Sequence, residues 1–249
     1  MKKRFLSSII LLPLLTSCSG FPISREDALD ILQNIENEIA STSSTSYTVT
    51  TKTTTEEAET EVIYIYSKEN QFYHTYTISN QSTGRIFESW KFRQTYKYEI
   101  KVDDQEVSED FIFTISRNLL PSNVDDLEKQ YVVTYEKYSD ESWNKYASEY
   151  EDRMARRFSD VIEHSRELVK DVSNSIDLKS INPNSIFLNS KESVVGVETQ
   201  TNEYEISFTN NMLNYVKTVS GKTTTETSFK YASGDILYPS YKILIPYNQ

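Results

Sequence analysis

The chain has 249 residues, of which 12% are aromatic, 37 are acidic and 26 are basic, and its formal net charge is −11. The aromatic content excludes an intrinsically disordered chain, and the acidic balance argues against binding to nucleic acid or to anionic headgroups through a basic surface. Because Cys18 is the single cysteine, neither a disulfide framework nor a thiolate metal site can form within the chain.

The N-terminus has the pattern of an export signal. Basic residues 2–4 precede an apolar run over residues 5–15, which is shorter than the about 20 apolar residues that a membrane-spanning helix needs. The run ends in Leu15-Thr16-Ser17-Cys18, which resembles the bacterial lipobox of one aliphatic residue, two small residues and a cysteine. The alternative is a buried free cysteine beside an ordinary secretory signal.

Resemblance to the lipobox implies a lipid anchor. In such lipoproteins the cysteine thiol receives a diacylglyceryl group with fatty-acyl chains such as palmitate, and a peptidase cuts between the residues that correspond to Ser17 and Cys18. Residues 1–17 would then be removed and residues 18–24 would form a short tether. The mature chain keeps 23 basic residues against 37 acidic ones, a net charge of −14. We therefore expect a protein of the bacterial cell envelope that faces outside the cytoplasm and is held to the cell membrane by its acyl chains.

Residues 25–249 are predicted to form one β-rich domain that begins with a helix. Ser24 suits an N-cap, and apolar residues recur at helical spacing from Ala28 to Ile39. From Tyr47 the period of the pattern changes to two, which is typical of strands. The first strands are expected within residues 45–55, 60–67, 71–80, 85–93, 95–102, 111–116 and 130–138.

Helical spacing returns at about residues 139–176. A helix of that length would extend about 50 Å, which is long for a small domain, so we expect a break or two helices. The stretch 181–185 should end this helical insert, and Asn210-Asn211 suits a tight hairpin. Further strands are expected at residues 192–199, 203–209, 212–220 and 222–231, and a short one near 241–245. The sequence KTTTE occurs at 52–56 and at 222–226, and indicates two exposed strand faces of similar composition.

This order of elements predicts an α+β fold with an antiparallel sheet of about 11–12 strands. An N-terminal helix, many antiparallel strands and a mid-chain helical insert in an exported chain resemble the LolA/LppX-type lipoprotein family, as does the C-terminal segment TSFKYASGDILYPS. The resemblance implies a strongly curved sheet, a half-open barrel, whose concave side is covered by the helices.

The sequence carries no nucleophile, phosphate-binding or calcium motif. His74 is expected in the core or in a cavity wall, and His164 in solvent. Adjacent carboxylates point in different directions and do not converge on one bond, which applies to Asp103-Asp104, Asp125-Asp126 and Glu151-Asp152. We therefore predict a protein that is not an enzyme and that has no cofactor and no metal site.

The aromatic residues outnumber those that a minimal core needs. Packing explains any single one, but together they could line an apolar cavity between the sheet and the helices. The predicted lining residues are Trp90, Phe92, Tyr96, Tyr98, Phe111, Phe113, Trp143, Tyr150 and Phe158. The function predicted from this set is binding of a lipid or other hydrophobic ligand by a monomer. The alternatives are a surface interaction or structural lipoprotein with a filled core, and an enzyme built around His74 and two or more buried acids.

Overall fold

The computed structural model describes most of the body of the chain. The described residues are 23–42, 46–79, 84–100, 105–119, 131–170, 176–182, 185–194 and 200–239. Ser17, Cys18 and the expected strand near 241–245 lie outside them.

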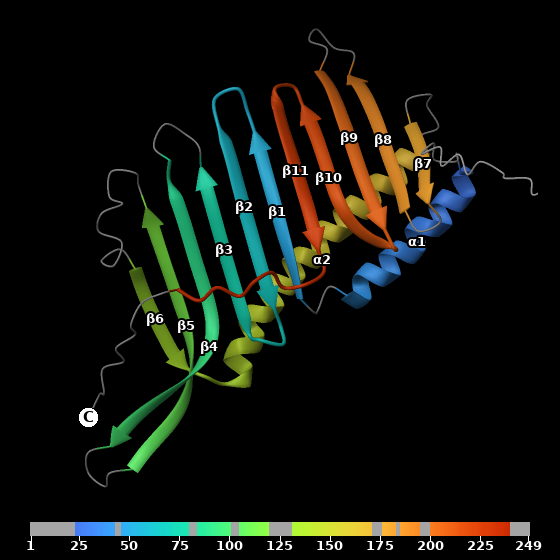
Figure 1. The fold of residues 1–249 in the computed structure, drawn as a ribbon. Helices are drawn as coiled ribbons and strands as arrows, with labels where there is room; N and C mark the ends of the chain where they lie inside the picture. Colours follow the sequence, from blue (N-terminus) through green and yellow to red (C-terminus); the bar gives the residue numbers. More distant parts are fainter. Residues whose placement is uncertain are drawn as a thin grey trace, which may run out of the picture.

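Two helices and eleven strands make up the described part (Figure 1). The helices are α1 (Arg25–Thr42) and α2 (Asp140–Lys170). The strands are β1 (Ser46–Thr54), β2 (Glu59–Ser67), β3 (Phe72–Ser79), β4 (Ile86–Ile100), β5 (Gln105–Leu119), β6 (Tyr131–Lys137), β7 (Ile176–Asn182), β8 (Ser185–Val194), β9 (Gln200–Thr209), β10 (Met212–Ser220) and β11 (Thr223–Lys230).

The strands form one antiparallel sheet with the order β6-β5-β4-β3-β2-β1-β11-β10-β9-β8-β7. The sheet is open, because β6 and β7 are its two edges. In the centre β1 pairs with β11, and this pairing places the two KTTTE segments side by side, with Lys52 opposite Glu226. The predicted α+β fold with an antiparallel sheet, an N-terminal helix and a long mid-chain helix is confirmed.

Helix α1 begins where the sequence predicts. The backbone N–H of Asp27 donates to Oγ of Ser24 at 3.1 Å, and this Oγ donates to the Asp27 carboxylate at 2.8 Å. The pair is a variant of the capping box, which satisfies helix N–H groups that have no partner in the helix.

Replacing Ser24 with alanine is expected to lower the free energy of unfolding by about 1 kcal/mol, because the N-cap acceptor is lost. Urea unfolding followed by circular dichroism measures the change. Ser41→Ala is the matched control, since the Ser41 hydroxyl donates to the Glu38 carbonyl at the other end of the helix. Equal losses in both variants would show that the cap contributes nothing specific.

Helix α2 is a single helix of 31 residues, so the prediction of a break is wrong. No glycine or proline occurs between Asp140 and Lys170, and the N–H of Ser142 donates to Oγ of Ser139 at 3.0 Å, which caps its start. The helix crosses the sheet diagonally, so the sheet provides a long surface against which the helix can pack (Figure 1). Neither helix of the described residues is long and apolar enough to cross a bilayer.

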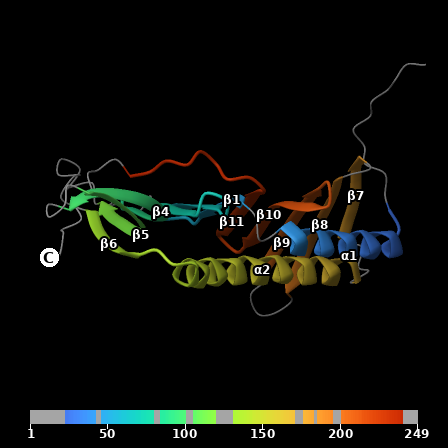
Figure 2. The ribbon, with the colours of Figure 1, turned by 90° about the horizontal axis from the view of Figure 1, so that it is seen from below.

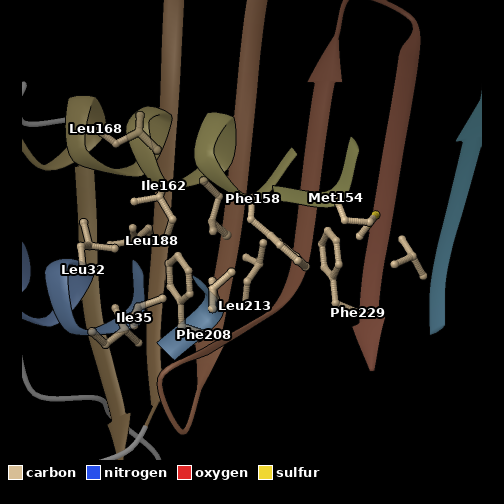
Figure 3. Packing of buried hydrophobic residues seen from close by; sticks show 14 of the residues in the cluster. Leu32, Ile35, Met154, Phe158, Ile162, Leu168, Leu188, Phe208, Leu213 and Phe229 are labelled. Carbon is tan, nitrogen blue, oxygen red and sulfur yellow. The ribbon is translucent and has the colours of Figure 1, made fainter. Parts of the chain in front are cut away.

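The main core lies between the helices and β1 and β8–β11 (Figure 3). Phe158 of α2 is 2% exposed there, and its ring centroid lies 5.3 Å from that of Phe229 in β11. Ile206 and Phe208 of β9 are both buried in this core.

The opposite face of the sheet carries a second apolar layer. Both helices lie on one side of the sheet, and residues 231–239, here named the C-terminal strap, cross the other side (Figure 2). Nε1 of Trp90 donates to the carbonyl of Leu237 at 3.1 Å, and the ring of Tyr238 lies 5.2 Å from that of Phe72. The strap therefore covers apolar residues that the helices do not reach.

Several element boundaries differ from the sequence-based expectation. The segments expected at 85–93 and 95–102 belong to one continuous strand, β4. Helix α2 ends at Lys170, before the expected end at about residue 176. Strand β7 and the start of β8 include residues of the stretch 181–185, at which we expected only a helix stop. The hairpin prediction is confirmed, since Asn210 and Asn211 have φ of 51° and 60°.

Candidate functional site

The structure divides the predicted lining residues among three places. Trp143 and Tyr150 line one cleft beside α2. Phe158 lies in the main core, and the side chain of Tyr98 lies outside what the structure describes. The remaining residues pack together on the face of the sheet that carries the strap: Trp90, Phe92, Tyr96, Phe111 and Phe113.

The aromatic cleft lies between the first half of α2 and strands β2, β3 and β4, and has a volume of about 150 Å³. It is lined by Tyr66, Tyr73, Lys91, Trp143, Tyr146, Ala147, Glu149, Tyr150 and Arg153. On α2 these residues recur at three- and four-residue spacing, which places them on one side of the helix.

The floor of the aromatic cleft comes from the register of the sheet. Tyr66 of β2 is opposite Tyr73 of β3, and Tyr73 is opposite Lys91 of β4. Residues directly opposite one another on neighbouring strands share one face of the sheet. Two phenol rings and one ammonium group therefore lie in a row beneath α2.

Tyrosine rings pack against one another in the aromatic cleft, Tyr73 edge to face with Tyr150 and Tyr66 tilted relative to it. The ring centroid of Tyr150 lies 4.7 Å from that of Tyr73 and 5.2 Å from that of Tyr66. Tyr66 donates its hydroxyl proton to the Glu151 carboxylate at 3.1 Å. The hydroxyl of Tyr150 is buried and has no hydrogen-bond partner among the described residues. Burial raises the pKa of both phenols, so the Tyr150 hydroxyl is an unused donor beside the cleft.

Two cationic side chains complete the aromatic cleft. Nζ of Lys91 lies 3.0 Å from the ring centroid of Tyr146, a cation–π contact. Burial lowers the pKa of Lys91, although the carboxylates of Glu136 and Glu149 partly offset this effect. Within the described residues neither Lys91 nor Arg153 forms an ion pair. Lys91 is thus a half-buried cation for which nearby carboxylates compensate only in part, without forming an ion pair among the described residues.

A second, more polar cleft of about 410 Å³ shares Trp143 and Ala147 with the aromatic cleft. Its other lining residues include Lys68 and Glu151, which form an ion pair of 3.3 Å. Because Lys68 and Glu151 pair with each other, their charges are less available to bind a ligand than those of Lys91 and Arg153 in the aromatic cleft.

A buried polar network lies on the strap side of the sheet. Glu88 is 7% exposed and accepts hydrogen bonds from Arg117 and from Nε2 of His74, the latter at 3.3 Å. The imidazole of His74 stacks on the indole of Trp90 with 4.9 Å between ring centroids. Burial alone would raise the pKa of Glu88, but the hydrogen bonds from His74 and Arg117 together outweigh it and lower the pKa. Sequence reasoning placed His74 in the core correctly but missed its partners.

The network does not bring a second acid to His74, since Glu88 is the only described carboxylate in contact with the ring. His164, expected in solvent, packs its ring 4.3 Å from the ring of Tyr204, so that expectation is wrong. No group of three or more metal-ligating side chains occurs among the described residues. No protein-family model matches the chain, and no curated protein matches it.

Proposed function

We propose that this protein is a non-enzymatic lipoprotein of the bacterial cell envelope. It is anchored to the cell membrane through a diacylglyceryl group on Cys18, and it binds a lipid or another hydrophobic ligand in the aromatic cleft. The observation that carries the binding function is a cleft lined by Trp143 and several tyrosines, among them Tyr150, whose hydroxyl has no hydrogen-bond partner in the described part of the chain. Ligand sites commonly combine apolar walls with a few such polar groups.

The arrangement of the layers supports a half-open barrel of the LolA/LppX type. Both helices lie on one face of an open antiparallel sheet (Figure 2), as that architecture implies. The core between the helices and β8–β11 is filled by apolar side chains such as Leu188 and Leu213, which are fully buried. We therefore place the proposed ligand site in the aromatic cleft at the first half of α2. Since typical pockets for drug-sized ligands measure about 300–1,000 Å³, a cleft of about 150 Å³ encloses only part of a lipid.

Replacing Tyr146 with alanine is expected to weaken ligand binding about tenfold, because burial of part of an aromatic ring contributes about 1–1.5 kcal/mol. Native mass spectrometry after mild extraction identifies a co-purified ligand, and displacement of a fluorescent fatty-acyl probe measures affinity. Tyr135→Ala is the matched control, since Tyr135 is 38% exposed and contacts Phe111 on the strap side of the sheet. Wild-type protein that carries no ligand and binds no probe would contradict the proposal.

The filled core also favours a second function, namely a scaffold that binds envelope proteins through its acidic exterior. A pull-down of envelope partners that is abolished by neutralising exposed acids, with the aromatic cleft intact, would support this function instead.

A further inference from the structure

We infer that the aromatic cleft selects amphiphiles with an anionic headgroup, such as a fatty-acid carboxylate, and that Lys91 and Arg153 bind that headgroup. This inference rests on the proposed ligand-binding function and adds the class of ligand to it.

The first argument is the pairing of charges elsewhere in the molecule. In this acidic protein, basic side chains on both faces of the sheet lie against carboxylates, as in Lys52–Glu59, Arg93–Asp110 and Arg117–Glu88. Lys91 is half-buried, yet it forms no ion pair among the described residues, and its ammonium lies against the uncharged ring of Tyr146. A half-buried ammonium that contacts a π-face and forms no ion pair gains more from an anion than an exposed lysine does.

The second argument is the convergence of donors on one small space. Lys91 comes from β4 and Arg153 from α2, and both line the same cleft as Tyr150, whose buried hydroxyl has no partner among the described residues. Ammonium, guanidinium and phenol groups all donate hydrogen bonds, and a carboxylate accepts several. The rings of Trp143 and Tyr146 leave an apolar wall for the first part of an acyl chain.

The titratable and charged groups around Lys91 determine how ligand binding depends on pH. Tyr66 and Tyr73 face it from β2 and β3, Glu136 from β6, and Tyr146, Glu149 and Arg153 from α2. Without a bound anion, burial holds the pKa of Lys91 below its ordinary value. A bound carboxylate favours the ammonium and raises this pKa, so binding is coupled to proton uptake and weakens as the pH rises through the pKa of the free site.

The test compares probes that share a ten-carbon chain and differ in headgroup. Decanoate, decyl maltoside and decyltrimethylammonium are titrated below their micelle-forming concentrations, and binding is measured by calorimetry. We expect decanoate to bind about tenfold more tightly than the other two. Lys91→Met should remove that advantage, so that decanoate binds no more tightly than decyl maltoside to this variant, and Lys91→Arg should restore it. Lys145→Met, an exposed lysine of α2 outside the cleft, is the control.

The outcomes separate the two proposals. Equal affinity for the three probes, or preference for the cation, overturns the headgroup inference and leaves the ligand-binding function standing. Loss of maltoside binding together with decanoate binding in Lys91→Met also overturns the headgroup inference, because the lysine would then contribute to the shape of the cleft and not to recognition of the headgroup. If wild-type protein binds none of the probes, the ligand-binding function fails with it. A decanoate affinity that falls at alkaline pH in wild type, and not in Lys91→Met, supports the inference.

Discussion

Replacing Cys18 with serine is expected to abolish lipid attachment and to leave an uncleaved or released protein. A serine hydroxyl cannot form the thioether that a lipobox cysteine forms. The chain that would remain after the proposed cleavage has a net charge of −14, which repels anionic headgroups, so its surface charge would not hold it to the bilayer. Incorporation of labelled palmitate, cell fractionation and the mass of the mature chain measure the effect, and we expect complete loss of label.

Ser17→Ala is the matched control for this experiment, since it keeps a small residue beside the cleavage point. It should be labelled, cleaved and sedimented with membranes like wild type. A Cys18→Ser protein that behaves in the same way would show that the lipobox interpretation is wrong and that the chain carries an ordinary secretory signal.

Replacing Glu88 with glutamine is expected to lower the free energy of unfolding by about 3 kcal/mol at neutral pH. Glu88 holds both His74 and Arg117 on the strap side of the sheet, and removal of one charge from a buried pair leaves the other without compensation. Arg117 keeps a hydrogen bond of 3.1 Å to Tyr131, which limits the loss. Denaturant unfolding measures the difference, with the exposed Glu57→Gln as the control.

The pH dependence of the Glu88 effect has a defined sign. Because the folded-state pKa of Glu88 is lowered, its stabilising contribution is complete above the ordinary glutamate pKa of about 4.3. It is lost as the pH falls through the lowered pKa. The gap in stability between wild type and Glu88→Gln should therefore shrink in acid. A gap that stays constant down to about pH 2 would mean that the carboxylate charge does not carry the effect.

Features set by neighbouring residues were predictable from the sequence, and features set by register were not. The Ser24 cap, the stripe of α1 and the Asn210-Asn211 turn each follow from a few adjacent residues. The row of Tyr66, Tyr73 and Lys91 depends on how three strands align. The alternation of apolar and polar residues along a strand separates the two faces of the strand. It does not indicate which face the helices cover, and for that reason we predicted Trp90 of β4 and Trp143 of α2 to line one cavity.

The expected break in α2 shows a second limit. A helix of 31 residues extends about 46 Å, which exceeds the width of a small sheet. Strands about 4.8 Å apart add up to about 50 Å across eleven strands. The sequence predicts each strand separately. The length of helix that the sheet can support depends on the width of the whole sheet, and the two halves of the sheet form one surface because β1 pairs with β11.

The antiparallel packing of α1 and α2 determines how far the aromatic cleft stands from the bilayer. Arg166 contacts Gln33 and Glu36, whereas Ala155 lines the same small cavity as Ala40. At 1.5 Å per residue, the start of α1 lies about 35 Å along the helix axes from Tyr150. Residues 18–24 span at most about 24 Å when extended. If the proposed anchor on Cys18 holds the protein with its long axis upright, the aromatic cleft stands beyond the reach of acyl chains in the membrane, and the proposed ligand would then enter from solution or from another carrier.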